Sequence, residues 1–150
     1  MKNDKIARTK VFLAEDDIDD RDFFLDALTE IEVPTKVKTF DNGIDLMDAL
    51  FSAKNLPEII FLDLRMPLMN GFECLADIRS FSQFSHINVI VYSSAYHDRE
   101  VNQLKDDGAN HYLQKPSTYK KLVEVLNLII QNITSKEEKA AIDKFEILLN

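Results

Sequence analysis

The chain has 150 residues, of which 45% are hydrophobic and 29% charged, a length and composition typical of one globular domain. The net charge of −8 argues against a basic surface for phosphate contacts, so we expect no direct binding to nucleic acid. The single cysteine, Cys74, excludes an intrachain disulfide framework, and no apolar run approaches the ~20 residues of a membrane helix. These features predict a cytoplasmic protein without a membrane segment.

The first half of the chain alternates between short apolar segments and segments with helical spacing. A buried strand is predicted for 10–17, where the apolar run stops abruptly in acid, and a helix for 20–31. A brief alternating strand at 36–40 precedes a helix at 41–53. The segment 58–64 is apolar at both odd and even positions, which is typical of a strand covered on both faces.

The second half continues the same alternation. A helix at 70–81 is followed by a doubly buried strand at 87–94 and a more polar helix at 98–109. A short strand at 111–116 precedes a strongly amphipathic last helix at 117–133. Five strands alternating with five helices predict an α/β fold with a parallel sheet and helices on both of its faces.

Several residues are predicted to define the helix ends and faces. Asp41 or Asn42 would open the second helix, and Ser117 would be the N-cap of the last one. Gly108 suits the position just after a helix C-terminus, and Phe51 would face inward from the second helix.

The ends of the chain flank a predicted domain at 10–133. Residues 1–9 would form an N-terminal tail, and 134–150 a C-terminal extension. This extension could be a tail, a sixth helix packed on the body, or a dimerisation segment. Ile142, Phe145 and Leu149 fall at helical spacing, which suggests a partner surface and a homodimer.

Polar side chains end four of the five predicted strands. Because the carboxyl ends of parallel strands lie at one edge of the sheet, these side chains should converge although they are far apart in the sequence. In chain order they are Glu15, Asp16, Asp17, Asp63, Ser93, Ser94 and Lys115.

The chemistry of this set is consistent with a phosphoacceptor site. Carboxylates at this density repel one another, by about 4 kcal/mol for a pair ~4 Å apart at an effective dielectric constant near 20. Either one is protonated or a cation lies among them, and oxygen-only ligands suit Mg²⁺. Lys115 offers a point charge to a phosphoryl group, and a serine hydroxyl could donate to one of its oxygens. Asp63 is then the candidate nucleophile, which would form an aspartyl phosphate.

Four stretches resemble the receiver domain of two-component response regulators: "EDD", "FLDLRMPLMNG", "VYSSA" and "GANHYLQKP". The resemblance covers residues 10 to about 133, and Asp63 stands 30 positions before Ser93 and 52 before Lys115, as is usual in the family. It implies a doubly wound, flavodoxin-like fold with five parallel strands in the order 2-1-3-4-5 and five helices.

The resemblance also implies roles for individual residues. Asp63 would be the phosphoacceptor, and Asp16 would bind Mg²⁺ directly with Glu15 assisting. Arg65 would give its backbone carbonyl to the metal, and Lys115 would pair with the phosphoryl group or with Asp63. Asp17 would be a lesser contributor, since the acidic pair of the family has only two members.

Ser93 and Tyr112 match the hydroxyl and the aromatic residue of the family's conformational switch. By resemblance, the phosphoryl group would come from a histidine kinase or a phosphotransfer protein, and the switch would change binding to a downstream protein. Only 17 residues follow position 133, so we expect a stand-alone receiver, similar to the chemotaxis regulators, and not an enzyme acting on an external substrate.

Two positions depart from the usual pattern. Arg65, two residues after Asp63, is a large cation near the route of an attacking water, and Ala95, two residues after Ser93, is too small to direct one. Our hypothesis is that these positions set the lifetime of phosphorylated Asp63.

Two other functions compete with this interpretation. The chain could be a receiver that docks to partners without phosphorylation. A phosphohydrolase resembling the haloacid dehalogenases would also use a strand-end aspartate. That family needs Asp-x-Asp on the first strand, whereas here Arg65 stands in place of the second aspartate and Asp63 ends the third strand.

Overall fold

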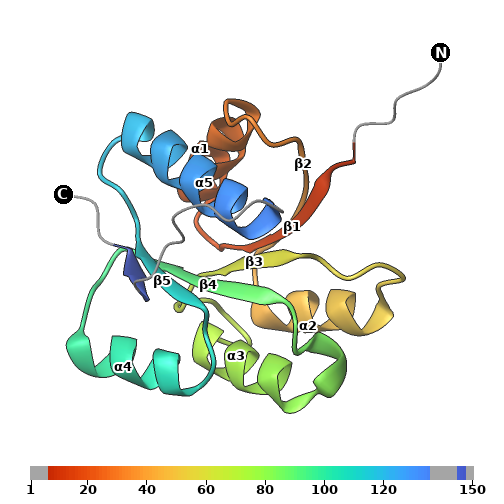
Figure 1. Cartoon of the computed structure of the whole chain (residues 1–150). Helices are drawn as coiled ribbons and strands as arrows, with labels where there is room; N and C mark the ends of the chain where they lie inside the picture. The colour runs from red at the N-terminus through yellow and green to blue at the C-terminus, as the bar shows by residue number, and fades with distance from the viewer. Residues whose placement is uncertain (1–6, 136–144, 148–150) are drawn as a thin grey trace.

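The computed structural model describes residues 7–135 and 145–147 as one parallel sheet with helices on both faces (Figure 1). The strands are β1 (Thr9–Ala14), β2 (Thr35–Phe40), β3 (Ile59–Leu62), β4 (Asn88–Ser93), β5 (His111–Gln114) and β6 (Glu146–Ile147). The helices are α1 (Ile18–Thr29), α2 (Gly43–Ser52), α3 (Gly71–Ser80), the 3₁₀ turn η1 (Ser82–Phe84), α4 (Asp98–Asp106) and α5 (Tyr119–Thr134). The predicted doubly wound α/β fold is confirmed.

The sheet order is β2-β1-β3-β4-β5-β6, with every neighbouring pair parallel. The predicted order 2-1-3-4-5 is therefore correct, and β6 extends it past β5. The prediction of five strands missed β6 because two residues are too few to carry a periodicity of their own. Their conformation depends on pairing with the open edge of β5, where Glu146 lies opposite Tyr112 and Ile147 opposite Leu113.

This pairing changes the expectation for the C-terminal extension. At Glu146–Ile147 the structure has a strand and not the helix that the spacing suggested. Phe145 is partly buried against the chain's own core, and Ile147 is buried. Ile142 and Leu149, the other two members of the predicted partner surface, lie outside the described residues.

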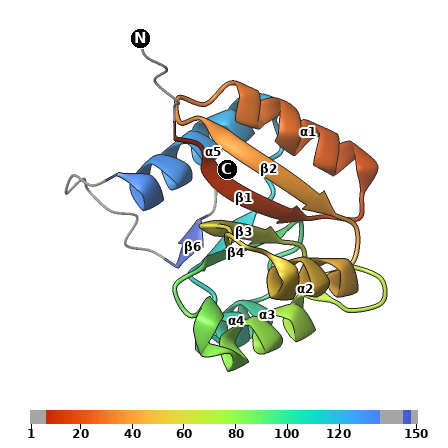
Figure 2. The same ribbon diagram turned by 90° about the vertical axis from the view of Figure 1, so that its right-hand side faces the viewer.

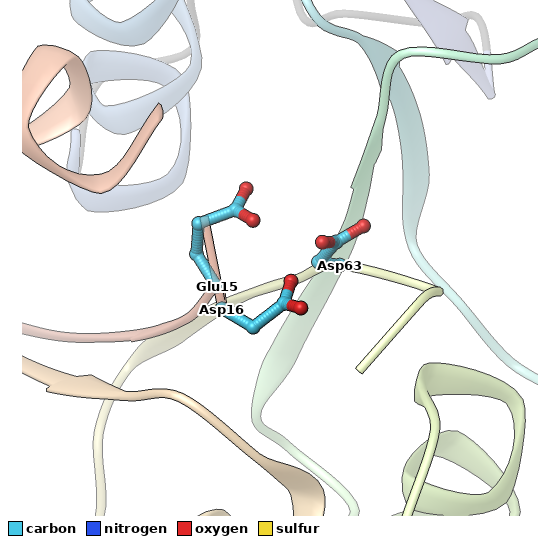
Figure 3. A group of neighbouring side chains, drawn as sticks. All are labelled: Glu15, Asp16 and Asp63. Carbon is cyan, nitrogen blue, oxygen red and sulfur yellow. The ribbon is translucent and has the colours of Figure 1, made fainter. Parts of the chain in front are cut away.

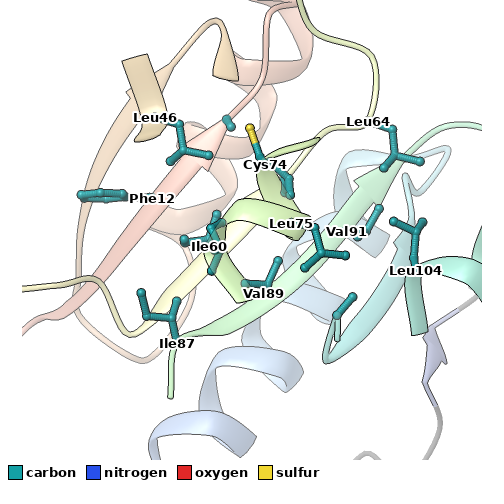
Figure 4. Packing of buried hydrophobic residues seen from close by; sticks show 14 of the residues in the cluster. Phe12, Leu46, Ile60, Leu64, Cys74, Leu75, Ile87, Val89, Val91 and Leu104 are labelled. Carbon is teal, nitrogen blue, oxygen red and sulfur yellow. The ribbon is translucent and has the colours of Figure 1, made fainter. Parts of the chain in front are cut away.

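The sheet lies between helices on both of its faces, as Figure 2 shows from the side. An apolar layer fills the space between the sheet and the helices on each face. In β1, Phe12 and Ala14 face the layer covered by α2, α3 and α4, which is seen from close by in Figure 4. Val11 and Leu13 face the opposite layer, covered by α1 and α5. Because both faces of each central strand are buried, the strands are continuously apolar, as the sequence indicated.

Side-chain caps fix where the helices begin. Asp17, Asn42 and Thr118 accept the backbone N–H three residues ahead, and Asn70 forms a reciprocal capping box with Glu73. The N-cap of α5 is thus Thr118 and not Ser117, because the Thr118 hydroxyl is the one that accepts the Lys121 amide. Each of these helices begins just beyond the carboxyl edge of the sheet, so its positive end points to that edge.

Two further predictions concern helix ends and faces. Gly108 follows the C-cap of α4 with φ +105°, the left-handed conformation that favours glycine at this position. Phe51 was expected inside, but it is 49% exposed on the last turn of α2, where its ring packs edge-on against Phe81 and Phe84.

Gly71 allows the loop after β3 to pass close to the start of α3. Its N–H donates to the Leu64 carbonyl at 3.0 Å, and a Cβ at position 71 would lie 2.4 Å from the Asp63 carbonyl oxygen. The Asp63 carbonyl oxygen belongs to the backbone, so it cannot rotate away to admit a side chain at position 71. The glycine therefore fixes the path of the chain on the carboxyl side of Asp63.

We predict that Gly71→Ala lowers the free energy of unfolding by about 1–3 kcal/mol, because the backbone at Asp63 and Leu64 must move to admit the methyl group. Urea denaturation measures the change. Asp77→Ala, on the exposed side of the same helix, is the control and should stay within about 0.5 kcal/mol of wild type. Equal stabilities of the two variants would contradict the close approach.

Candidate functional site: an acidic pocket at the carboxyl edge

The strand register brings the predicted site residues together. Ala14 lies opposite Leu62, so the residues that follow, Glu15 and Asp63, leave the sheet side by side. Ser93 lies opposite Gln114, and the Lys115 amide donates to the Ser93 carbonyl at 2.8 Å. The parallel arrangement alone therefore gathers residues from four strands at one edge.

These strand ends line a depression of about 770 Å³, which we call the acidic pocket. Its lining residues are Glu15, Asp16, Asp17, Ile18, Asp19, Asp20, Asp63, Arg65, Ser93, Ser94, Ala95 and Lys115. All of the predicted site residues except Tyr112 are among them, and six of the lining side chains are acidic against two basic ones.

Three carboxylates form the centre of the pocket. Oxygen atoms of Glu15, Asp16 and Asp63 all lie within 4.8 Å of one another, and Figure 3 shows the three side chains directed into a common space. Glu15 is completely buried and Asp63 is 6% exposed, whereas Asp16 is exposed. Two of the three charges are thus largely removed from water, which makes an isolated anionic state costly.

Burial has the expected effect on proton binding. The pKa of Glu15 is raised to about 8, first by burial and then by its hydrogen bond with Asp63, while Lys115 acts in the opposite direction. Burial also raises the pKa of Asp63, against the lowering effects of the Glu15 hydrogen bond and of the Lys115 charge. Without a divalent cation in the cluster, the carboxyl pair therefore retains a proton near neutral pH even beside Lys115.

Asp17 lies beside the cluster but has a structural contact. Its carboxylate accepts the Asp20 amide at 3.0 Å as the N-cap of α1, and its own amide donates to Glu15 Oε2 at 3.2 Å. The side chain is thereby directed along the helix start.

Lys115 forms the ion pairs of the pocket. Its ammonium nitrogen lies 2.6 Å from Glu15 Oε1 and 2.8 Å from Asp20 Oδ2. Within the described part of the chain, its ion pairs go to these two carboxylates and not to Asp63. Asp20 was missed by the sequence analysis. Its contact with Lys115 depends on how the first turn of α1 lies against the end of β5, which no local sequence pattern records.

Ser93 and Tyr112 lie next to each other behind the pocket. Ser93 is buried at the end of β4, where its Oγ accepts the Ala95 amide at 3.4 Å. Tyr112 is 1% exposed, its hydroxyl donates to the Ala95 carbonyl, and the ring of Tyr96 packs edge-on at 5.8 Å. Ser93 and Tyr112 are therefore connected through the backbone of Ala95, in the β4–α4 loop.

Arg65 connects the pocket to α4. Its backbone amide donates to Asp63 Oδ1 at 3.4 Å, while its guanidinium binds Glu100 Oε2 at 3.0 Å and lies 5.8 Å from the centre of the Phe72 ring. The partner on α4 could not be read from the sequence, because it depends on how the two elements pack.

With this fold and site, the chain belongs to the response regulator receiver domain family, whose family description matches residues 11–127. Receiver domains of this family interact with histidine kinases or phosphotransfer proteins. The resemblance drawn from the sequence is thus confirmed.

Two curated relatives are each 29% identical to this chain over the aligned residues. The sensor histidine kinase TmoS of Ectopseudomonas mendocina is 29% identical over 125 residues, which cover 83% of this chain and 12% of that protein. The probable C4-dicarboxylate response regulator DctR of Bacillus subtilis is 29% identical over 117 residues, covering 78% of this chain and 50% of that protein. The chain therefore spans half or less of the length of these relatives.

Solved structures agree with the fold. The phosphorylated cyanobacterial phytochrome response regulator RcpA superposes with a TM-score of 0.80 at 28% identity, covering 88% of this chain and 98% of that one. Among the residues described, no helix has the length and apolar character to span a membrane.

The raised pKa of Glu15 leads to a prediction about how the free energy of unfolding depends on pH. In a chelator-treated sample, folded protein holds a proton on Glu15 up to about pH 8, whereas the unfolded chain releases it near 4.5. The free energy of unfolding, relative to that of Glu15→Gln, should therefore fall as pH rises from 5 to 8, by at most about 1.4 kcal/mol per pH unit for one group.

Urea denaturation of both proteins at several pH values measures this difference. Asp19→Asn, a neutralisation at an exposed position of the same pocket, is the control and should leave the pH dependence of wild type in place. A difference in the free energy of unfolding between wild type and Glu15→Gln that stays constant from pH 5 to 8 would contradict the raised pKa of Glu15.

Proposed function

We propose that Asp63 accepts a phosphoryl group in an Mg²⁺-dependent reaction and that the resulting conformational change carries a signal to a protein target. The observation that supports this most is the convergence of the Glu15, Asp16 and Asp63 carboxylates with Lys115 in one pocket of a receiver-family chain.

The residues of the cluster fit a hard divalent cation. They offer only oxygen atoms within a short distance of one another, and the Glu15 carboxyl group among them is completely buried. Asp16 and Asp63 would bind Mg²⁺ directly, with Glu15 assisting and the Arg65 carbonyl as a further ligand. The cation supplies neutralisation of the charge that develops on the transferring phosphoryl group.

In the proposed reaction, an oxygen of Asp63 attacks the phosphorus of a phosphohistidine on a kinase or phosphotransfer protein. A P–O bond forms as the P–N bond breaks, and the imidazole leaves with that electron pair and takes up a proton. Asp63 must be a carboxylate to attack, and a divalent cation bound among the carboxylates would favour this charged state. The Lys115 ammonium and the Ser93 hydroxyl would then bind oxygens of the phosphoryl group.

The switch would start at Ser93. Movement of this residue toward the phosphoryl group displaces the adjoining backbone at Ala95, whose carbonyl accepts the Tyr112 hydroxyl. A shift from ~1% to ~99% active needs about 5.5 kcal/mol. Two or three charge-assisted hydrogen bonds, at about 1.5–3 kcal/mol each, provide enough free energy.

We predict that acetyl phosphate with Mg²⁺ adds one phosphoryl group to the wild-type protein, seen as a mass gain by intact-protein mass spectrometry. Chelation of the metal and Asp63→Asn should each abolish the gain, because they remove the cation and the nucleophile. Asp19→Asn is the matched control in the same pocket and should still be labelled. An unlabelled wild-type protein would instead support a receiver that docks without phosphorylation.

A second prediction concerns how long the phosphoryl group persists. Arg65 lines the pocket, and its contact with Glu100 holds a cation at the rim, on the proposed route of water. We predict that Arg65→Asn speeds the loss of the phosphoryl group roughly two- to fivefold, the size expected for a screened charge at a surface.

The time course of label loss after removal of acetyl phosphate measures this rate. Arg99→Gln removes a nearby exposed arginine of α4 and should leave the rate unchanged. A rate for Arg65→Asn equal to or slower than wild type would refute a protective role.

A further inference from the structure

A carboxylate on α1 has a contact that the proposed reaction does not use. Asp20 Oδ2 accepts a hydrogen bond of 2.8 Å from Lys115 Nζ, across 95 positions of sequence. The Asp20 amide is bound to the Asp17 cap, so the first turn of α1 fixes the backbone from which this side chain projects. Lys115 is thereby connected to α1 as well as to Glu15 at the end of β1.

The two partners of Lys115 differ in their environment. Glu15 is completely buried within the carboxylate cluster, whereas the Asp20 side chain is 43% exposed. Loss of the ammonium would leave Glu15 without compensation in a dry site, but water can solvate a released Asp20. When Lys115 must take a new partner, the contact with Asp20 is therefore the easier one to break.

A phosphoryl group on Asp63 would be such a partner. It brings negative charge and acceptor oxygens into a pocket where acidic side chains already outnumber basic ones. Lys115 is 12% exposed and held by anions on two sides, so the phosphoryl oxygens compete with Asp20 for it.

We propose that Asp20 is a positioning residue that holds Lys115 toward α1 before phosphorylation and so limits how readily Asp63 is phosphorylated. The inference rests on the proposed function and concerns the regulation of the same site. In this account the first turn of α1 sets the reactivity of the acceptor through the position of one ammonium group.

The test compares single neutralisations within one pocket. Asp20→Asn keeps the size of the side chain and the backbone contact with the Asp17 cap, and removes the charge that attracts Lys115. We expect its initial rate of phosphorylation by acetyl phosphate and Mg²⁺ to exceed that of wild type by roughly two- to fivefold, the range for a partly exposed ion pair.

Asp19→Asn removes the same charge from the neighbouring residue, which lines the pocket without an ion pair to Lys115. It should change the rate less than Asp20→Asn does. Asp20→Glu keeps the charge and should return the rate toward wild type, an outcome that a purely structural role of the residue would not produce. Urea denaturation should show that all three variants are folded.

The outcomes separate this inference from the proposed function. If wild type is labelled but Asp20→Asn is no faster than Asp19→Asn, or is slower than wild type, Asp20 does not restrain Lys115 and the inference fails alone. If wild type is not labelled, the proposed function and the inference fail together.

Discussion

Burial of Glu15 and Asp63 beside each other, with one ammonium from Lys115, is the interaction on which the site depends. One ammonium group, which also binds Asp20, does not balance two carboxylate charges at the dry edge of a sheet. The raised pKa of Glu15 and the directed contacts of Lys115 are two consequences of this one constraint. A divalent cation would replace the proton that the carboxyl groups retain. A phosphoryl group on Asp63 would replace Asp20 as a partner of Lys115.

The fold produces this crowding by simple means. Parallel strands all end at the same edge, and the register of β1 with β3 puts Glu15 and Asp63 next to each other without any long connecting loop. Helices on both faces exclude water from the strands, and Gly71 lets the chain turn away closely after Asp63. The helix that follows β1 supplies Asp20, so the same element that covers the sheet also reaches the reactive edge.

Much of this architecture could be predicted from sequence, because strand burial and strand ends leave local patterns. The apolar run before Asp63 and the acidic stop after β1 were sufficient to bring Glu15, Asp16 and Asp63 to one edge. Contacts that depend on the packing of one element against another left no such pattern. The partners of Lys115 and Arg65 on α1 and α4 required the structure, as did the exposure of Phe51 and the pairing of β6 with β5.

The central claim is that the three carboxylates form an Mg²⁺-dependent phosphoacceptor with Asp63 as its reactive member. A crystal structure of the phosphorylated protein with Mg²⁺ tests it most directly. The account predicts the phosphoryl group on an oxygen of Asp63, Mg²⁺ bound by Asp16 and the phosphoryl group, and Lys115 on a phosphoryl oxygen. A phosphoryl group on another residue, or a metal bound away from Glu15, Asp16 and Asp63, would contradict it.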